Sequence, residues 1–326
     1  MISKIDFTIY PWLINYYHVI GIISLFANCY ALFLVLFKSE KLDNFKYYLL
    51  AFQTSCFLVD VFFTFLMQPH NLYPMPAGFC TGILAKNHLV PDNILIDILT
   101  FLVCCQFAAI AFCFWKKYWS IRKIQNEKVS LWVVVLVIGA YPFCTFGVLA
   151  PFYYSGKDGE EKWEIVRRDY PEYEQQFLSL DNFGIYDLSF LWQFSLFAAC
   201  FAISWFGGSI FYCTTRIYDI LGKLTSRMSS TTHKKHRTAM KSLVAQLTIS
   251  IVAVIPFSCV VVFLIIEFQY AQVVIRILLM IFGTHAAANA IILVITTPPY
   301  RNFTCFWRTR TRSTSSFAQK TSIFGL

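Results

Sequence analysis

Seven long apolar stretches, separated by polar segments, dominate the chain. At a rise of about 1.5 Å per helical residue, each is long enough to cross a hydrocarbon core of about 30 Å. The stretches cover residues 12–37, 45–67, 93–115, 130–152, 186–213, 243–266 and 272–297. The pattern predicts an all-α membrane protein, a bundle of seven transmembrane helices between a short head at 1–11 and a tail at 298–326. We find no internal repeat and no second domain.

The sixth stretch, Leu243–Ile266, has the most distinctive pattern. A basic run at 233–237 and Lys241 lead into it, and Pro256 lies within it. Proline removes one backbone hydrogen bond, so we predict a helix kink at Pro256. A bent helix with a basic root suits an element that moves, although a plain span that tolerates a proline has the same pattern.

Composition supports a membrane protein. The chain is 57% hydrophobic and 14% charged, and soluble domains carry more charge than this. The first apolar stretch is too long for the h-region of a signal peptide, so no cleavable leader is expected. The eleven cysteines show no metal-binding spacing. We find no phosphate-binding glycine loop, zinc-protease motif or nucleophile elbow, and expect no enzyme activity, metal or cofactor.

The charged residues predict the orientation. Lysines and arginines gather after the first, third, fifth and seventh stretches, whereas residues 153–185 are rich in acidic side chains. By the positive-inside rule the basic segments face the cytosol, so the N-terminus lies outside and the C-terminus inside. Seven spans in this orientation are the arrangement of G-protein-coupled receptors, which we favour over transporters and channels.

Several motifs carry a resemblance to a known family. They are Asn44–Gln53 (NFKYYLLAFQ), Gln68–Phe79 (QPHNLYPMPAGF) with Gly82 after it, Gln246 with Pro256, and Pro299-Tyr300-Arg301. From about Tyr17 to Arg301 the chain resembles nematode serpentine chemoreceptors of the Str superfamily, class H or class I, with class I favoured. The resemblance implies a multi-pass receptor in the cell membrane of sensory neurons, plausibly in their cilia. It also implies detection of small environmental molecules and signalling through a heterotrimeric G protein.

The chain departs from the rhodopsin-like pattern at two places. The third stretch ends Phe114-Trp115-Lys116-Lys117-Tyr118, without an acidic-Arg-aromatic switch. The segment 153–185 contains no cysteine, so whether Cys80 forms a disulfide stays open.

Polar residues inside the apolar stretches are costly in a membrane and therefore candidates for function. Counted from the cytosolic end, Asn28 and Asn289 lie at similar depths, and so do Asp60 and His285. Each pair would meet by hydrogen bonding inside the bundle; the alternative is that each residue bonds separately to backbone or water.

A receptor pocket is expected between the outer ends of the helices. The candidate ligand-binding residues are Asp97, Gln106, Trp192, Arg276 and His285. Arg276 would hold an anionic group of the ligand or pair with Asp97. An arginine that extends to the membrane interface gives the same pattern.

The basic cytosolic segments are expected to meet the G protein and anionic lipid. The candidate coupling residues are Lys234, Lys235, Arg237, Lys241 and Arg301. In the active state the inner ends of the fifth and sixth spans would be displaced and expose this surface. The net charge of +9 would also suit nucleic acid, but the basic segments adjoin spans and contain no nucleic-acid module, so no such partner is expected.

The alternative function is a ligand-gated channel or a small-molecule transporter. A transporter is expected to show an internal repeat or paired broken helices, and we find neither. A channel needs a polar pore stripe, and polar residues within the stretches are sparse.

Overall fold

The computed structural model describes residues 5–39, 44–125, 130–223, 229–252 and 270–305, and a few positions between 254 and 268. The long helices are α1 (Pro11–Phe37), α2 (Phe45–Val61), α4 (Asp92–Ile124), α5 (Leu131–Ser155), α8 (Phe190–Lys223), α9 (Ser230–Val252) and α11 (Ala271–Thr296). The short helices are α3 (Ile83–Lys86), α6 (Gly159–Asp169), α7 (Glu174–Leu178) and α12 (Pro298–Thr304), with a 3₁₀ turn η3 (Pro171–Tyr173). A π-helical segment, η2 (Phe62–Met67), continues α2.

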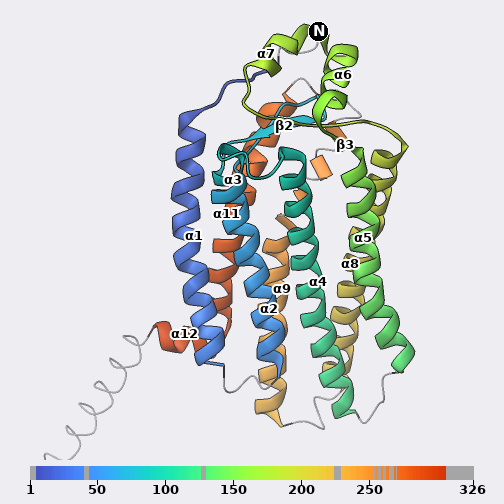
Figure 1. Cartoon of the computed structure of the whole chain (residues 1–326). Coiled ribbons are helices and arrows are strands. Elements are labelled where there is room, and N and C mark those ends of the chain that lie inside the picture. The colour runs from blue at the N-terminus through green and yellow to red at the C-terminus, as the bar shows by residue number, and fades with distance from the viewer. Residues whose placement is uncertain are drawn as a thin grey trace, which may run out of the picture.

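The long helices stand side by side as one bundle (Figure 1). Six of those in the described part of the chain are long and apolar enough to cross a membrane. The remaining helix, α9, holds the beginning of the sixth apolar stretch. Pro256 lies outside the described residues, so the predicted kink has no structural description. The seven-helix bundle predicted from the apolar pattern is confirmed.

Large apolar side chains cover the outer faces of the helices. Phe26, Trp132, Phe143 and Phe211 are each more than two-thirds exposed. Soluble proteins rarely expose contiguous apolar surface on this scale, because contact with water is unfavourable for such groups. Contact with lipid tails removes that cost, so these faces are the lipid-facing surface of a multi-pass membrane protein.

A four-stranded antiparallel sheet covers one end of the bundle, together with α6 and α7 (Figure 1). The strands are β1 (Pro69–Asn71), β2 (Ala77–Cys80), β3 (Gly156–Lys157) and β4 (Gly184–Tyr186), in the order β1-β2-β4-β3. We call this the sheet end. The two segments that form it were expected to be loops, so the prediction of a purely helical chain missed a small β layer.

The sheet end has an apolar core of its own. Its buried members include Leu72, Phe79, Val166, Phe177 and Ile185. These residues come from the two long connections, 68–92 and 153–185, which bury their apolar side chains by packing on each other and on the N-terminal segment. That burial is the physical reason why the acidic segment 153–185 is folded.

The opposite end of the bundle carries α12, and we call it the tail end (Figure 1). The N-terminal residues lie at the sheet end, where the backbone N–H of Asp6 donates to the Gln272 side chain across 3.1 Å. The first and last described segments therefore lie at opposite ends, as an odd number of crossings requires.

Three helices extend further at the tail end than the apolar stretches do. α4 continues to Ile124, α8 continues to Lys223, and α9 begins at Ser230. Lysine and arginine are good helix formers, and Arg122 and Lys123 in the last turn of α4 also favour the helix dipole. The end of an apolar stretch thus marks the end of lipid contact but not the end of the helix.

Candidate functional site

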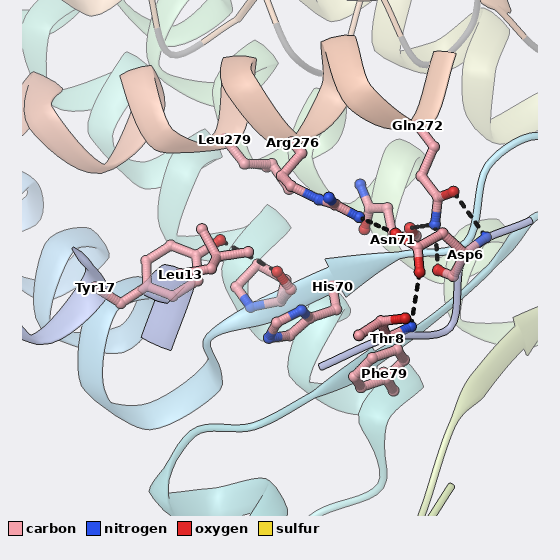
Figure 2. A pocket seen from close by; sticks show the side chains of 11 residues that line it. Asp6, Thr8, Leu13, Tyr17, His70, Asn71, Phe79, Gln272, Arg276 and Leu279 are labelled. Carbon is pink, nitrogen blue, oxygen red and sulfur yellow. Dashed lines mark hydrogen bonds and ion pairs between the residues drawn. The ribbon is translucent and has the colours of Figure 1, made fainter. Parts of the chain in front are cut away.

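A small cavity lies at the sheet end, where the N-terminal segment, β1, β2 and α11 meet (Figure 2). Its lining residues are Asp6, Thr8, Leu13, Tyr17, Pro69, His70, Asn71, Phe79, Gln272, Arg276 and Leu279. Its volume of about 10 Å³ is too small for more than one water molecule. The side chain of Asp6 and its backbone fill the space beside α11.

Asp6 is the centre of this cluster. Its Oδ2 lies 3.2 Å from Arg276 Nη2 and accepts the Tyr10 hydroxyl at 2.7 Å. Its Oδ1 accepts the backbone N–H of Thr8 at 3.0 Å. Partial burial alone would raise the pKa of Asp6, but the hydrogen bonds from Tyr10, Thr8 and Arg276 lower it to about 2. The carboxylate is therefore ionised at any physiological pH.

The backbone of Asp6 is held as well as its side chain. Gln272 Oε1 accepts the Asp6 N–H, and Gln272 Nε2 donates to the Asp6 carbonyl at 2.7 Å and to the Asn71 carbonyl at 3.1 Å. Gln272 and Arg276 are four residues apart on α11 and therefore share one face. The Arg276 guanidinium also lies 4.6 Å from the centroid of the Tyr10 ring, a cation–π contact. We call Asp6, Tyr10, Gln272 and Arg276 the Asp6 clamp.

The structure of the Asp6 clamp identifies the ion-pair partner of Arg276, which the sequence left open. Arg276 forms its ion pair with Asp6, so the suggested pairing with Asp97 was wrong. The two partners are 270 positions apart in the chain, and no local pattern joins them.

His70 lies beneath the clamp on β1. Its ring stacks on Phe79 with centroids 4.8 Å apart, and its Nε2 lies 3.1 Å from the Thr81 hydroxyl. Burial, and then the positive charge of Arg276, lower the pKa of His70 to about 4. The imidazole is therefore neutral at physiological pH.

Two of the predicted ligand-binding residues meet inside the bundle. His285 Nε2 on α11 lies 3.3 Å from the side-chain amide of Gln106 on α4, and His285 Nδ1 lies 2.6 Å from the Phe282 carbonyl. A carbonyl only accepts, so Nδ1 carries the proton and Nε2 accepts. His285 Nε2 and the Gln106 side chain form a hydrogen bond when the amide of Gln106 presents its NH₂ group to the imidazole.

The other three predicted ligand-binding residues lie apart from this pair: Arg276 in the Asp6 clamp, and Asp97 and Trp192 elsewhere on the helices. Asp97 is half-buried in α4 and Trp192 is half-buried in α8. Within the described part of the chain, no hydrogen bond or ion pair joins either of them to His285, Gln106 or Arg276.

The two predicted interhelical pairs do not form. Asn28 accepts the Gln53 side-chain N–H at 2.7 Å, and Asn289 donates to Ser250 at 3.3 Å. His285 meets Gln106, whereas Asp60 is buried on α2 near Ser24. Depth along the bundle was the basis of the prediction, but depth does not say which helix faces which.

A larger pocket opens at the tail end between α4 and α8, with a volume of about 260 Å³. Its lining residues are Tyr118, Arg122, Gln125, Tyr212, Arg216, Asp219, Ile220 and Lys223. The pocket carries three cationic side chains and one carboxylate, and that carboxylate already pairs with Lys223 at 3.0 Å. We call this the basic pocket.

The basic pocket was missed because all its residues except Tyr212 lie beyond the predicted ends of the third and fifth apolar stretches. Once α8 continues to Lys223, a spacing of three to four residues places Tyr212, Arg216, Asp219 and Lys223 on one helix face. That spacing is present in the sequence. It was overlooked because the fifth helix was expected to end at residue 213.

The predicted coupling residues also lie at the tail end. Lys234, Arg237 and Lys241 are exposed on α9, and Arg301 is exposed on α12. The side chain of Lys235 lies outside the described part of the structure. The hydroxyl of Ser242 lies 2.7 Å from that of Thr296 and 3.3 Å from that of Thr297. These contacts hold the root of α9 beside the start of α12, so the inner ends of the sixth and seventh spans are neighbours, as expected.

A bundle of seven membrane helices, capped at one end and basic at the other, defines a seven-transmembrane receptor. The model of the family described as "Serpentine type 7TM GPCR chemoreceptor Sri" matches residues 3–304. The chain therefore belongs to the Sri family of serpentine chemoreceptors, and it is a G-protein-coupled chemosensory receptor. This confirms the resemblance to serpentine chemoreceptors and decides against the channel or transporter alternative.

Comparison with solved structures supports the fold. The crystal structure of squid rhodopsin is similar, with a TM-score of 0.53 and 15% sequence identity, over 94% of this chain and 87% of that one. At that identity the likeness shows the fold alone. No curated protein compared with the chain gives a match.

Proposed function

We propose that this receptor detects small environmental molecules that approach its sheet end and activates a heterotrimeric G protein at its tail end. The sheet end would face outside and the tail end the cytosol. The positive-inside rule supports this orientation, because the basic segments lie at the tail end. The motif resemblance further supports class I of the Str superfamily and a location in sensory cilia.

The concentration of positive charge at the tail end is the observation that carries the coupling proposal. Lys234, Arg237 and Lys241 follow one another at intervals of three and four residues, so they share a face of α9. With Lys235 and Arg301 they form the proposed coupling surface. The basic pocket between α4 and α8 extends this surface.

Activation would separate the inner ends of α8 and α9. Ligand binding can shift this equilibrium only through a difference in affinity between the two states. In the resting state the cations would meet anionic lipid, at about 1 kcal/mol per residue near the membrane surface. In the active state they would meet acidic groups of the G protein.

The ligand would be recognised between the helices, below the sheet. Asp97, Gln106, Trp192 and His285 are the proposed ligand-binding residues within the bundle, and Arg276 is the proposed one at its outer end. The contact between His285 and Gln106 supports this, because it places polar groups of α4 and α11 together inside the bundle.

The coupling proposal is tested with charge-neutralised receptors. In the test variant Lys234, Lys235, Arg237 and Lys241 are changed to Gln. A matched control changes four cationic residues of the sheet end to Gln, namely Lys86, Lys157, Lys162 and Arg167. Nucleotide exchange on the purified G protein is measured with each receptor in membranes, after equal amounts of correctly oriented receptor have been confirmed.

We expect the test variant to lose most receptor-stimulated exchange and the control variant to keep it. Exchange at the wild-type rate in the test variant would mean that these charges serve membrane insertion only. The coupling surface would then lie elsewhere.

A further inference from the structure

The Asp6 clamp satisfies the carboxylate of Asp6 more completely than a surface ion pair requires. Tyr10 and Arg276 contact one carboxylate oxygen, and the Thr8 N–H contacts the other. Gln272 meets both the N–H and the carbonyl of the same residue. Every polar group of Asp6 therefore has a hydrogen-bonding or ion-pair partner. The polar groups of a ligand bound in a receptor site are satisfied in the same way.

Asp6 is the only acidic residue among those that line the cavity. The Arg276 side chain is 21% exposed and has no other carboxylate within the lining, while the neutral His70 supplies no negative charge. If Asp6 left, a largely buried guanidinium would face the vacated space without a counter-charge among the described residues that line the cavity. Such a group attracts an anion, because a buried charge without a partner is unfavourable.

The N-terminal segment has a second attachment that does not involve Asp6. Ile5 packs in the apolar core of the sheet end, and the Phe7 ring lies 5.2 Å from Phe177 and 5.9 Å from Tyr173. Release of the Asp6 carboxylate would therefore free the anion site without detaching the segment from the cap.

We propose that the Asp6 clamp is an anion-binding site in which Asp6 acts as a tethered occupant, and that a small carboxylate-bearing molecule displaces it. The chemistry of the Asp6 side chain indicates the ligand class. Arg276 and Tyr10 contact its carboxylate, whereas Gln272 stays bonded to the backbone of residue 6, so the ligand is a small carboxylate that takes the place of the side chain alone. The site belongs to the receptor function proposed above and assigns a chemical class to its ligand.

Displacement of the Asp6 carboxylate by a ligand would affect the helix bundle through α11. Gln272 and Arg276 lie in its first turns, and the same helix carries His285 further along. A ligand that replaces Asp6 would change what holds the outer end of α11, while the Tyr10 ring beneath the guanidinium would remain available to it. The N-terminal segment would then be joined to α11 only through the backbone bonds of Asp6 with Gln272.

A tethered occupant competes at high local concentration and lowers the apparent affinity for a free ligand. Removing the Asp6 carboxylate should therefore tighten binding of free carboxylates by about tenfold or more. Removing Arg276 should abolish it.

The probe is acetate, which reproduces the carboxylate and the adjoining carbon of the Asp6 side chain. Its binding to the full-length receptor in detergent is measured as a concentration-dependent rise in Tm, with no G protein present. The receptors compared are wild type, Asp6→Asn, Asp6→Ala and an Asp6→Ala/Arg276→Gln double variant. Glu172→Ala, which removes an exposed acidic residue of the same end, is the matched control.

We expect the probe to bind Asp6→Ala and Asp6→Asn at least about tenfold more tightly than wild type or Glu172→Ala. The double variant should not respond, and acetamide, the uncharged analogue of acetate, should stabilise none of the receptors. Equal affinity for all the variants, or binding that survives loss of Arg276, would overturn the proposal. Equal binding of inorganic phosphate would overturn the carboxylate class. Because no G protein is used, failure of the coupling proposal would leave these results unchanged.

Discussion

The neutral state of His70 predicts a pH-dependent loss of stability. His70 is 7% exposed, and its pKa falls from 6.5 to about 4 in the folded receptor. Between these values the unfolded chain binds a proton that the folded receptor does not. The contribution of neutral His70 to stability is therefore complete above pH 6.5 and is lost as the pH falls toward 4.

The size of this effect follows from the two pKa values. Each unit of pKa difference corresponds to about 1.4 kcal/mol, so the full loss below pH 4 is about 3 kcal/mol. Between pH 7 and pH 5 the loss in the free energy of unfolding is about 2 kcal/mol. Thr81, Phe79 and the guanidinium of Arg276 surround the ring, and a protonated imidazole would find no carboxylate partner among these three.

The assay is thermal unfolding of the purified receptor in detergent at pH 7 and pH 5. Wild type is compared with His70→Gln, and His88→Gln at an exposed position of the same end serves as control. Other titrating groups contribute equally to all three proteins, so the difference between them isolates His70. Wild type and His88→Gln should lose about 2 kcal/mol more than His70→Gln between the two pH values. An equal loss in all three would refute the reasoning.

Three further predictions concern the fold and its orientation. Gly82→Ala should destabilise the receptor by about 3 kcal/mol, because a Cβ there would lie 2.4 Å from the backbone carbonyl oxygen of Leu66. The control Gly139→Ala, whose Cβ would have nothing within 4 Å, should raise Tm slightly. Similar melting temperatures for the two variants would contradict this prediction. A double-mutant cycle of Asn28→Ala and Gln53→Ala should give a coupling of about 0.6–1.7 kcal/mol, and zero coupling would mean that their hydrogen bond adds nothing. An epitope at the N-terminus should label on intact cells and one at the C-terminus only after permeabilisation, whereas the reverse pattern would remove the proposed orientation.

The apolar pattern was sufficient to predict the bundle, because a membrane-crossing helix needs a long apolar run that few other structures share. Helix ends were predicted less well. At the tail end the solvent changes from lipid to water while the backbone stays helical, so Arg122 and Lys223 lie on helices where loops were expected.

The sheet end and the clamp could not be predicted from the sequence in the same way. Strands of two to four residues are too short to show alternation, and the segments that pair are far apart in the chain. Arg276 was recognised as a candidate because a charge near a span is costly. Its partner, Asp6, lies in a short polar head with no pattern that relates it to α11.

The central claim is that an external small molecule produces a response through a G protein. The measurement that tests it most directly is a calcium-reporter screen of small-molecule panels, with parallel conductance recordings, in cells expressing the full chain with and without the G protein. We expect at least one compound to evoke a response that disappears in cells lacking the G protein and returns when the G protein is restored. A ligand-evoked current of unchanged size in cells lacking the G protein would contradict the claim and identify the chain as a channel.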